Sequence, residues 1–374
     1  MSIKCRYTGR QQEQARGTQE CGHRNAGDVL PGRGEVTTRS SAAGPPTTPC
    51  PPVTDNIPGP GPLYPLVDVW LDWDNGFVKI RFAVSAGVSG GDFDRFAVDL
   101  TDIETMGFDT VWLSDVPLGA TIDPIVGLAY ATAATSTLKL GANIVPIGRN
   151  PLTLAKSLAQ IDRLSQGRLL LSFVVGLDQL GERKALGASG ANRGRLLEQM
   201  TPMLQRWWAG ESVNDRDAQG HYLFDDVASP SQSFQQPLEV WFGGSGPVAL
   251  VRAGRFADGW LGSALSPQEA QAARERIEEA ASESGRTIDP EHFGLSVPYA
   301  AHEPDRRTIE LLRRRQPDAD LEQLLPVGPG QLRDLLAAHI EAGLSKFVVR
   351  PVDRHDDRHR ALSDLADLLL PLQS

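Results

Sequence analysis

The residues with the clearest chemical meaning form a glycine-rich loop, Gly243-Gly244-Ser245-Gly246-Pro247. The loop follows the apolar run 238–242 and precedes the helical pattern of 248–256. Glycine lets backbone N–H groups approach a ligand closely, and the first turn of a helix adds unpaired N–H groups and the positive end of its dipole. The pattern therefore predicts a site for the phosphate of a cofactor. A tight strand-to-helix turn that binds nothing has the same pattern and stays open as the alternative.

Strand and helix patterns alternate along the chain from Val78 onward. Continuous apolar runs, without polar alternation, are typical of parallel strands that are covered on both faces. The helical segments between them begin at capping residues such as Asp92 and Ser266 and end at glycines such as Gly107 and Gly343. Eight strands are predicted, over 78–85, 110–114, 138–145, 168–175, 238–242, 259–262, 292–300 and 346–350.

Eight strand–helix units over about 290 residues predict an α/β fold, the (β/α)8 TIM barrel. Its active site would lie at the C-terminal ends of the strands. A doubly wound open sheet is the alternative, because the sequence pattern does not show closure. The stretch 176–237 makes the connection after the fourth strand an insertion, and long connections of this kind often cover a site.

The first 76 residues differ in composition from the rest of the chain. They are dense in Gly, Pro, Ser, Thr, Gln and Arg and lack a sustained apolar period, so they cannot bury enough surface to offset their chain entropy. We therefore expect a disordered tail over 1–76 and a folded domain over 77–374. The tail holds all three cysteines, Cys5, Cys21 and Cys50. Their spacing fits no common zinc site, and no metal is predicted.

The charge and hydropathy of the chain limit its partners. The net charge of −10 and the isoelectric point near 5.3 disfavour nucleic acid and anionic membranes, which usually attract an excess of Lys and Arg. A small molecule is the expected partner. No apolar run reaches the roughly 18 to 20 residues that span a bilayer, so a soluble protein is expected. The confined cysteines and the lack of a signal-peptide core favour a cytoplasmic location.

Three stretches of the folded part resemble, in the same order, the luciferase-like monooxygenase superfamily of flavin- and coenzyme F420-dependent barrel enzymes. The first stretch resembles the part of the family fold that runs from the third strand to the fourth strand. The second stretch resembles the cofactor-phosphate loop and the beginning of the strand that follows it. The third resembles the terminal helix and the eighth strand. They read GANIVPIGRNPLTLAKSLAQIDRLSQGRLLLSFVVG (141–176), PLEVWFGGSGPVALVRAGRFADGWL (237–261) and GPGQLRDLLAAHIEAGLSKFVVRP (328–351).

The resemblance implies a cofactor whose tricyclic ring lies over the mouth of the barrel and whose phosphate tail runs to the GGSGP loop. Members of the family use coenzyme F420 or reduced FMN, and the Gly246-Pro247 step is more similar to the F420-dependent branch. We therefore expect F420, with FMN as the alternative. The implied activity is that of an oxidoreductase or monooxygenase on a small organic substrate, by hydride transfer or by oxygen activation on reduced flavin. A homodimer is the family expectation.

The resemblance also assigns residues to the cofactor site. Asn143 and Ile144 match the position at which many members have a non-prolyl cis peptide against the ring. Such a bond costs about 3 to 4 kcal/mol and needs surroundings that enforce it. Val175 and Gly176 end the fourth strand, where Gly176 permits close backbone approach. The GGSGP loop contributes backbone N–H groups to the phosphate, with the hydroxyl of Ser245 as a further donor.

The catalytic assignment follows the family less closely. Asp115, at the end of the second predicted strand, matches a carboxylate near the reactive ring atoms, but the histidine that commonly follows it is Val116 here. A capping role fits Asp115 equally well. Family members often have a glutamate after the fourth strand, where this chain has Leu177 and Asp178.

Further positions lie near the predicted mouth. Arg149 follows the third strand, where it is placed to pair with phosphate or substrate, or to form a surface ion pair. Ser263, Tyr299 and Arg350 lie at or near the ends of the last three strands and by position face the pocket.

Two other functions stay open. The missing histidine and glutamate favour a cofactor-binding barrel with little or no turnover, acting as a carrier or a regulatory module. A barrel that binds a sugar phosphate through the same loop is a third interpretation.

Overall fold

The computed structural model describes residues 78–86, 93–177, 179–216, 223–229, 231–315, 320–352 and 358–374. The predicted tail over 1–76 and the predicted helix cap Asp92 lie outside these residues. In the part of the chain that the structure describes, no helix is long and apolar enough to cross a membrane.

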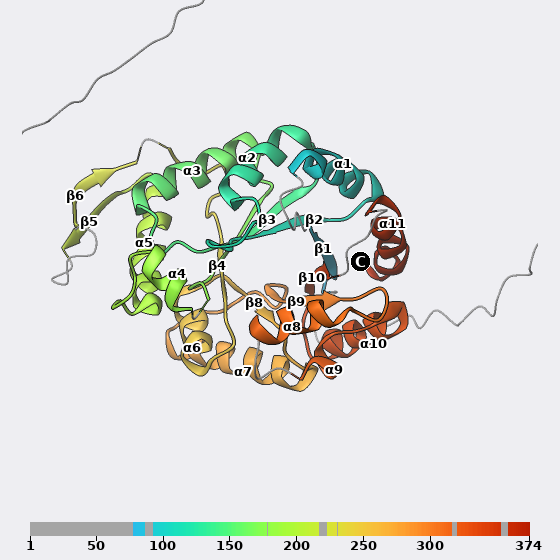
Figure 1. Ribbon diagram of the computed structural model, residues 1–374. Helices are drawn as coiled ribbons and strands as arrows, with labels where there is room; N and C mark the ends of the chain where they lie inside the picture. The colour runs from blue at the N-terminus through green and yellow to red at the C-terminus, as the bar shows by residue number, and fades with distance from the viewer. Residues whose placement is uncertain are drawn as a thin grey trace, which may run out of the picture. The chain divides into compact units, whose positions relative to one another are not determined.

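Eight parallel strands close into a barrel, which confirms the predicted fold (Figure 1). The barrel closes through β1, because Val84 pairs with Val349 on one side and with Val111 on the other. An open sheet would leave its two edge strands without this pairing, so that alternative is excluded. Around the barrel the strands follow the order β1 (Arg81–Ser85), β10 (Lys346–Pro351), β9 (Phe293–Tyr299), β8 (Gly259–Ser263), β7 (Val240–Gly243), β4 (Leu169–Phe173), β3 (Lys139–Ile144) and β2 (Thr110–Ser114).

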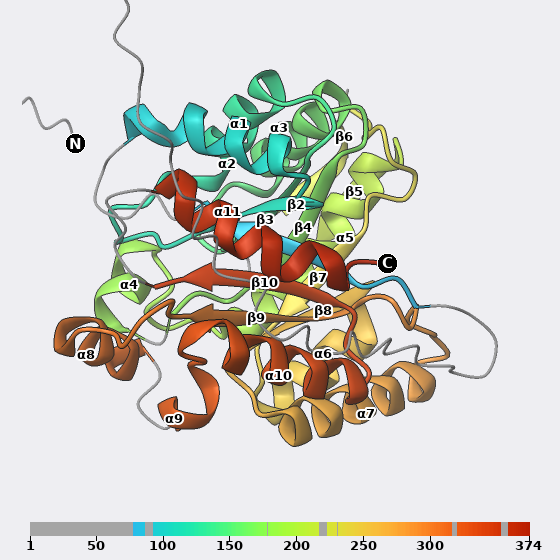
Figure 2. The same cartoon turned by 90° about the vertical axis from the view of Figure 1, so that its right-hand side faces the viewer.

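Helices cover the outside of the barrel (Figures 1 and 2). The larger ones are α1 (Phe96–Met106), α2 (Pro124–Ala134), α3 (Pro151–Leu164), α5 (Arg193–Trp208), α6 (Pro247–Phe256), α7 (Pro267–Glu283), α8 (Arg306–Arg315), α10 (Gly328–Glu341) and α11 (Arg358–Leu369). Asp123, Asn150 and Ser266 cap α2, α3 and α7 by accepting backbone hydrogen bonds, and a proline follows each of them. Gly107 ends α1 at a φ of 92°, a left-handed conformation that glycine adopts without strain. Shorter segments are η1 (Phe93–Arg95), α9 (Leu321–Leu324) and η2 (Leu370–Leu372).

The connection between β4 and β7 is an insertion, as predicted. It contains α4 (Leu180–Ala185), α5 and an antiparallel pair of strands, β5 (Ser212–Arg216) and β6 (Leu223–Ala228). This hairpin packs on α5, where Trp207 Nε1 donates to Val227 O at 2.8 Å, and it lies outside the ring of helices in Figure 1. In Figure 2, α4 lies at the end of the barrel toward which the arrowhead of β10 points. The part of the insertion that can shape a site at this end is therefore α4 and not the hairpin.

The interior of the barrel is apolar in the middle and polar toward its mouth. Successive side chains of a strand point alternately into the barrel and toward the helices. The inward side chains in the middle are Ala83, Trp112, Leu170, Trp241, Leu261 and Val348. Two residues further along the same strands, the inward positions are Ser85, Ser114, Ser172, Gly243, Ser263 and Arg350. The mouth at the C-terminal ends of the strands therefore has a polar floor.

Glycines make room for the two large side chains of the apolar layer. A Cβ on Gly141 would overlap the ring of Trp112, and one on Gly259 would overlap the ring of Trp241. The two indoles therefore lie directly against the backbone of the neighbouring strands.

Candidate functional site

The residues predicted to form the site lie at the C-terminal ends of four neighbouring strands. β2, β3, β4 and β7 pair side by side in this order. Asp115 directly follows β2, Gly176 lies just beyond β4, and Gly243 ends β7. The fold thus brings together Asp115, Asn143, Ile144, Val175, Gly176, Gly243, Gly244, Ser245, Gly246 and Pro247 along one side of the mouth.

The glycine-rich loop has the strand–turn–helix structure that its sequence predicts, with Gly246 as the N-cap residue of α6. Trp260 Nε1 anchors the loop by donating to Gly244 O at 2.9 Å. The backbone N–H groups of Gly244, Ser245 and Gly246 donate no hydrogen bond to any residue that the structure describes, and all three residues are exposed. Together with the positive end of α6, these groups form a cradle whose polarity suits an anion.

At two positions of this loop, steric constraints explain why the residue is a glycine. Gly244 has a φ of 106°, which other residues rarely adopt. A Cβ on Gly243 would lie 2.6 Å from Val174 Cγ1, so the end of β4 packs directly against the loop. The cradle and the end of β4 therefore belong to the same part of the mouth.

Asp115 is held by Arg149 and by the backbone of β3's end. Its side chain is 5% exposed, and its Oδ2 accepts hydrogen bonds from Val145 N at 3.0 Å and Arg149 Nη2 at 2.9 Å. The same Nη2 lies 2.8 Å from Asp123 Oδ2. Arg149 therefore forms the ion pair that was one of its two predicted roles, although the pair is largely buried.

Burial dominates the protonation of Asp115. It raises the pKa of this carboxyl, while the hydrogen bond from Val145 and the charge of Arg149 oppose the rise. For Arg149, burial acts to lower the pKa, but the hydrogen bond to Asp123 and the negative charges of both carboxylates outweigh it, so the pKa is raised. The second oxygen of Asp115, Oδ1, accepts no hydrogen bond from the described residues. Asp115 thus presents one oxygen through which it can hold a proton or accept a hydrogen bond from a ligand.

The peptide between Asn143 and Ile144 is trans, contrary to the cis bond that the resemblance implies. In the described residues, the one cis peptide is Gln236–Pro237. The pairing of β3 with β4 continues without interruption through both residues, and Ile144 O accepts from Val174 N at 2.9 Å. Asn143 is half-buried, whereas the side chain of Ile144 is fully buried in the main core. A ligand at the mouth would meet Asn143 through its side chain and Ile144 through its backbone.

The turn after β4 is held by two residues that the sequence did not point to. Glu182 of α4 accepts from Leu177 N at 2.6 Å, and Arg193 of α5 donates to Val175 O and Leu177 O. A carboxylate is therefore present at the turn, although Leu177 stands at the expected position and Asp178 lies outside the described residues. Glu182 gave no signal because α4 has only six residues, and Arg193 gave none because nothing in its own sequence places the first residue of α5 against the end of β4.

The other strand-end residues divide into two groups. Ser263 and Arg350 lie on inward positions, and Arg350 Nε donates to Ser296 Oγ at 2.8 Å. Tyr299 is instead buried in the main hydrophobic core, so the expectation that it faces the pocket was wrong. It lies an even number of residues from Phe293, Leu295 and Val297, which all belong to that core, and so it shares their face of β9.

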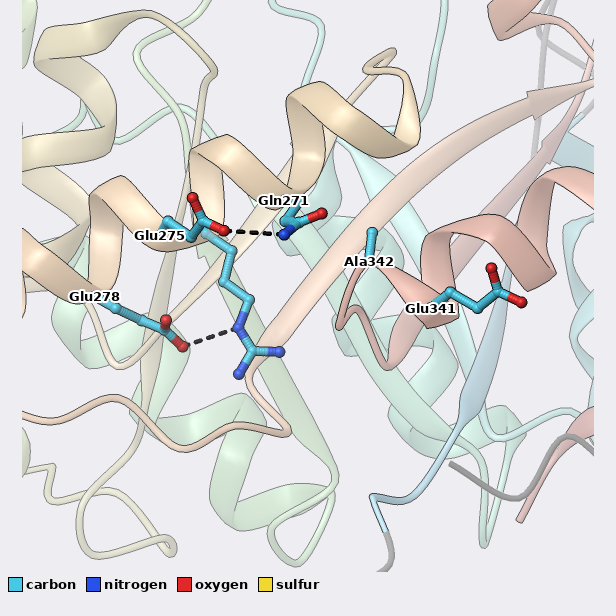
Figure 3. A pocket seen from close by; sticks show the side chains of 6 residues that line it. Gln271, Glu275, Glu278, Glu341 and Ala342 are labelled. Carbon is cyan, nitrogen blue, oxygen red and sulfur yellow. Dashed lines mark hydrogen bonds and ion pairs between the residues drawn. The ribbon is translucent and has the colours of Figure 1, made fainter. Parts of the chain in front are cut away.

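A hollow of about 170 Å³ lies elsewhere, between α7 and α10 on the helical layer (Figure 3). Arg274 forms an ion pair with Glu278 at 2.8 Å there, and Glu341 is near the C-terminal end of α10. The hollow is smaller than the roughly 300 to 1,000 Å³ of ordinary ligand pockets. It is also remote from the strand ends that carry the predicted residues, so it is not the candidate site. Among the described residues, no three His, Cys, Asp or Glu side chains gather as a metal site.

Comparison with known proteins gives the relationship of the chain. A family model described as "Luciferase-like monooxygenase" matches residues 77–348. The F420-dependent hydroxymycolic acid dehydrogenase of Mycobacterium tuberculosis is 30% identical over 189 residues, which cover 48% of this chain and 51% of that enzyme. This chain therefore matches about half the length of that relative.

Two solved structures share the fold. An F420-dependent secondary alcohol dehydrogenase in complex with an F420–acetone adduct aligns with a TM-score of 0.67 and 17% identity, over 79% of this chain and 100% of the other. The oxygenating constituent of 3,6-diketocamphane monooxygenase from Pseudomonas putida, in complex with FMN, aligns with a TM-score of 0.60 and 17% identity, over 79% and 99% of the two chains. The fold is thus shared with one protein that holds an F420 adduct and one that holds FMN.

Proposed function

Because the chain belongs to the luciferase-like monooxygenase family, we propose that it is a coenzyme F420-dependent oxidoreductase that acts on a small organic substrate. FMN is the alternative cofactor. The observation that carries the proposal is the anion cradle after β7, which directly follows Gly243, a residue packed against Val174 just beyond β4. The dehydrogenase relative, whose name states dependence on F420, supports F420 ahead of FMN.

The residues of the mouth suit the parts of such a cofactor. The N–H groups of Gly244, Ser245 and Gly246 would hold the phosphate, because they have no described partner within the chain and no side chain of a neighbour covers them. Asn143 and the backbone of Gly176 would orient the ring above the polar floor. Ile144 and Val175 would contribute their backbone, and Pro247 would fix the start of α6.

When bound, F420 supplies hydride chemistry and reduced FMN supplies electrons for oxygen activation. The chain's own contribution is to bind, orient and exclude water, and to manage a proton. Asp115 carries the carboxyl group among the strand-end residues named above that the structure describes, and its Oδ1 is the oxygen that its described neighbours leave unengaged. We assign the proton to this atom, because burial raises the pKa of Asp115 toward the range in which an acid exchanges protons.

The second candidate is a cofactor-binding barrel with little or no turnover. The observation that favours it is the ion pair of Asp115 with Arg149, which stabilises the charged carboxylate and so works against proton transfer. Val116, in place of the usual histidine, removes the side chain expected to share the task. The homodimer and the cytoplasmic location stay predictions, as does the disordered tail.

Titration of the full-length chain with F420 and with FMN tests the proposal. We expect saturable binding of F420, with a lower dissociation constant than for FMN. Ser245→Asp places a negative charge in the exposed cradle and should weaken binding about tenfold or more, whereas the neutral Ser245→Asn should stay close to the unmodified chain. Binding of neither cofactor by the unmodified chain would refute the proposal. Binding of F420 without any substrate-dependent change in its absorbance, across a panel of alcohols and ketones, would favour the carrier.

A further inference from the structure

The turn after β4 is fixed by charged side chains and not by secondary structure. Glu182 Oε1 accepts from Leu177 N at 2.6 Å. Arg193, the first residue of α5, donates from Nη1 to Val175 O at 2.9 Å and to Leu177 O at 2.7 Å. Three backbone groups that flank Gly176 are therefore engaged by two side chains of the insertion.

Gly176 itself lies between these bonds. It has a φ of 79°, and a Cβ on it would overlap Glu182 Oε1 and lie 3.4 Å from Val145 Cγ1. Neither its N–H nor its C=O takes part in a hydrogen bond with any residue that the structure describes. Both carbonyl groups of its neighbours and the N–H of Leu177 are occupied, so a ligand that reaches this turn meets the backbone of Gly176.

The arrangement is costly if its task is stability alone. Glu182 is 1% exposed, and a carboxylate that is removed from water loses hydration that one backbone hydrogen bond replaces incompletely. Arg193 is also partly desolvated: burial lowers its pKa and the charge of Arg183 lowers it further, while the charge of Glu182 opposes both without outweighing them. A surface turn usually satisfies its backbone through water or its own chain at no such cost. A buried carboxylate and a half-buried guanidinium on one turn therefore indicate that the geometry of the turn matters.

We propose that Glu182 and Arg193 are positioning residues of the cofactor site, which hold the turn of Val175 to Leu177 so that the backbone of Gly176 meets the ring of the cofactor. The inference rests on the proposed function, because the ligand of the turn is the cofactor. Glu182 also answers the expectation of a glutamate after the fourth strand. It acts on the backbone of the turn and not on the reacting atoms.

The test compares cofactor binding with stability in the full-length chain. Glu182→Ala removes the acceptor of Leu177 N–H and should raise the F420 dissociation constant about tenfold, the loss expected for one charge-assisted hydrogen bond that orders the site. Glu182→Gln keeps an acceptor oxygen at the same place and should bind within about threefold of the unmodified chain. Arg193→Met removes both carbonyl contacts and should weaken binding at least as much as Glu182→Ala.

Arg206→Met is the matched control, since Arg206 lies at the other end of α5. Its guanidinium joins Glu211 at 2.9 Å and also donates to Ser212 O, so the variant loses an ion pair and a carbonyl contact on the same helix. We expect Arg206→Met to lower the melting temperature and to leave the dissociation constant unchanged. The bound ring should also show a shifted absorbance maximum in Glu182→Ala and not in Arg206→Met.

The outcomes separate the two proposals. If the unmodified chain binds neither F420 nor FMN, the proposed function fails before the variants are compared. The unmodified chain is expected to bind F420. If both variants, Glu182→Ala and Arg193→Met, bind F420 as tightly as the unmodified chain does, the positioning role is overturned while the proposed function stands. Should Glu182→Ala fail to fold, Glu182→Gln and Arg193→Met still give the comparison, and equal binding by both overturns the inference.

Discussion

Asp115 and Arg149 form an ion pair at the mouth of the barrel, with 2.9 Å between Oδ2 and Nη2. The same nitrogen reaches Asp123, whose other oxygen caps α2 through Ile125 N at 2.8 Å. One guanidinium therefore links the end of β2, the loop after β3 and the start of α2. The candidate acid is thus part of the frame of the barrel, and its pKa depends on the charges of Arg149 and Asp123.

Replacing Arg149 with methionine should leave Asp115 buried without its cation. We expect the free energy of unfolding to fall by about 2 to 3 kcal/mol at pH 7, because an uncompensated charge remains in the protein. The pKa of Asp115, already raised by burial, should rise further once the opposing charge of Arg149 is lost. The deficit should therefore shrink as the pH falls and Asp115 takes up a proton. Urea denaturation at pH 7 and pH 4 measures this, with Arg149→Lys as the control that keeps the charge. An equal deficit at both pH values would contradict the assignment.

His339 should make stability depend on pH between about 6.5 and 4. It is fully buried on α10, and burial lowers its pKa from 6.5 to about 4. The unfolded chain therefore binds the proton first, so the contribution of neutral His339 is complete above pH 6.5 and is lost as the pH falls toward 4. At about 1.4 kcal/mol per pH unit, the loss amounts to about 3 kcal/mol. Denaturation of His339→Gln over the same pH range should show a shallower dependence of the free energy of unfolding on pH, equivalent to about one proton fewer taken up on unfolding. An unchanged slope would show that other groups carry the dependence.

Glu104 should act at lower pH. Its Oε1 accepts from Ser136 N, Thr137 N and Leu138 N at 2.8, 2.6 and 3.0 Å. Burial acts to raise the pKa of Glu104, but these hydrogen bonds outweigh it and lower the pKa to about 2. The stabilisation is present above pH 4.5 and is lost as the pH falls toward 2.

For this half-buried group we expect Glu104→Gln to cost about 1 kcal/mol at pH 7, a value discounted for solvent screening. Thermal unfolding at pH 7 and pH 2.5 should show a difference from the unmodified chain at the higher pH that disappears at the lower one. A difference that persists at pH 2.5 would mean that shape, and not charge, holds the loop.

Replacing Asp162 with asparagine, its amide counterpart, should destabilise the fold. Its carboxylate is fully buried and accepts from Phe234 N at 2.7 Å, Gln235 N at 2.8 Å and Gln235 Nε2 at 2.7 Å. Asp162→Asn turns one acceptor into a donor that faces donors, so the free energy of unfolding should fall by about 3 kcal/mol. Ser157→Ala, on the exposed side of the same helix, is the control and should change it by less than about 0.5 kcal/mol. A similar loss in both variants would contradict the role of Asp162.

The strands could be predicted because their sequence pattern is local. The run 292–300 contains β9 at Phe293–Tyr299, and the run 110–114 coincides with β2. Closure could not be predicted, because it depends on the pairing of Arg81 with Lys346, which no local pattern contains. The hairpin of β5 and β6 was missed because SVNDR and LFDDVA carry charges and polar residues and form no apolar run.

The candidate site was predictable where backbone conformation decides it. The glycine-rich loop is recognisable because few residue types other than glycine adopt the positive φ that the backbone has at Gly244. Glu182 and Arg193 were not, because their role depends on where α4 and the start of α5 lie against the end of β4. Tyr299 shows the converse: the position at the end of β9 was right, but the face of the strand is set by the register of the barrel.

The two indoles under the polar floor give the barrel an optical property. Trp112 and Trp241 belong to the layer directly below the inward residues of the mouth, and each ring occupies the space that a side chain on a glycine of the next strand would fill. A chromophore that settles on the floor comes within the range of energy transfer from both. The protein therefore carries intrinsic fluorophores directly below the site where a bound cofactor would be detected. The variants Trp112→Phe and Trp241→Phe separate the emission of these two residues from that of the other tryptophans.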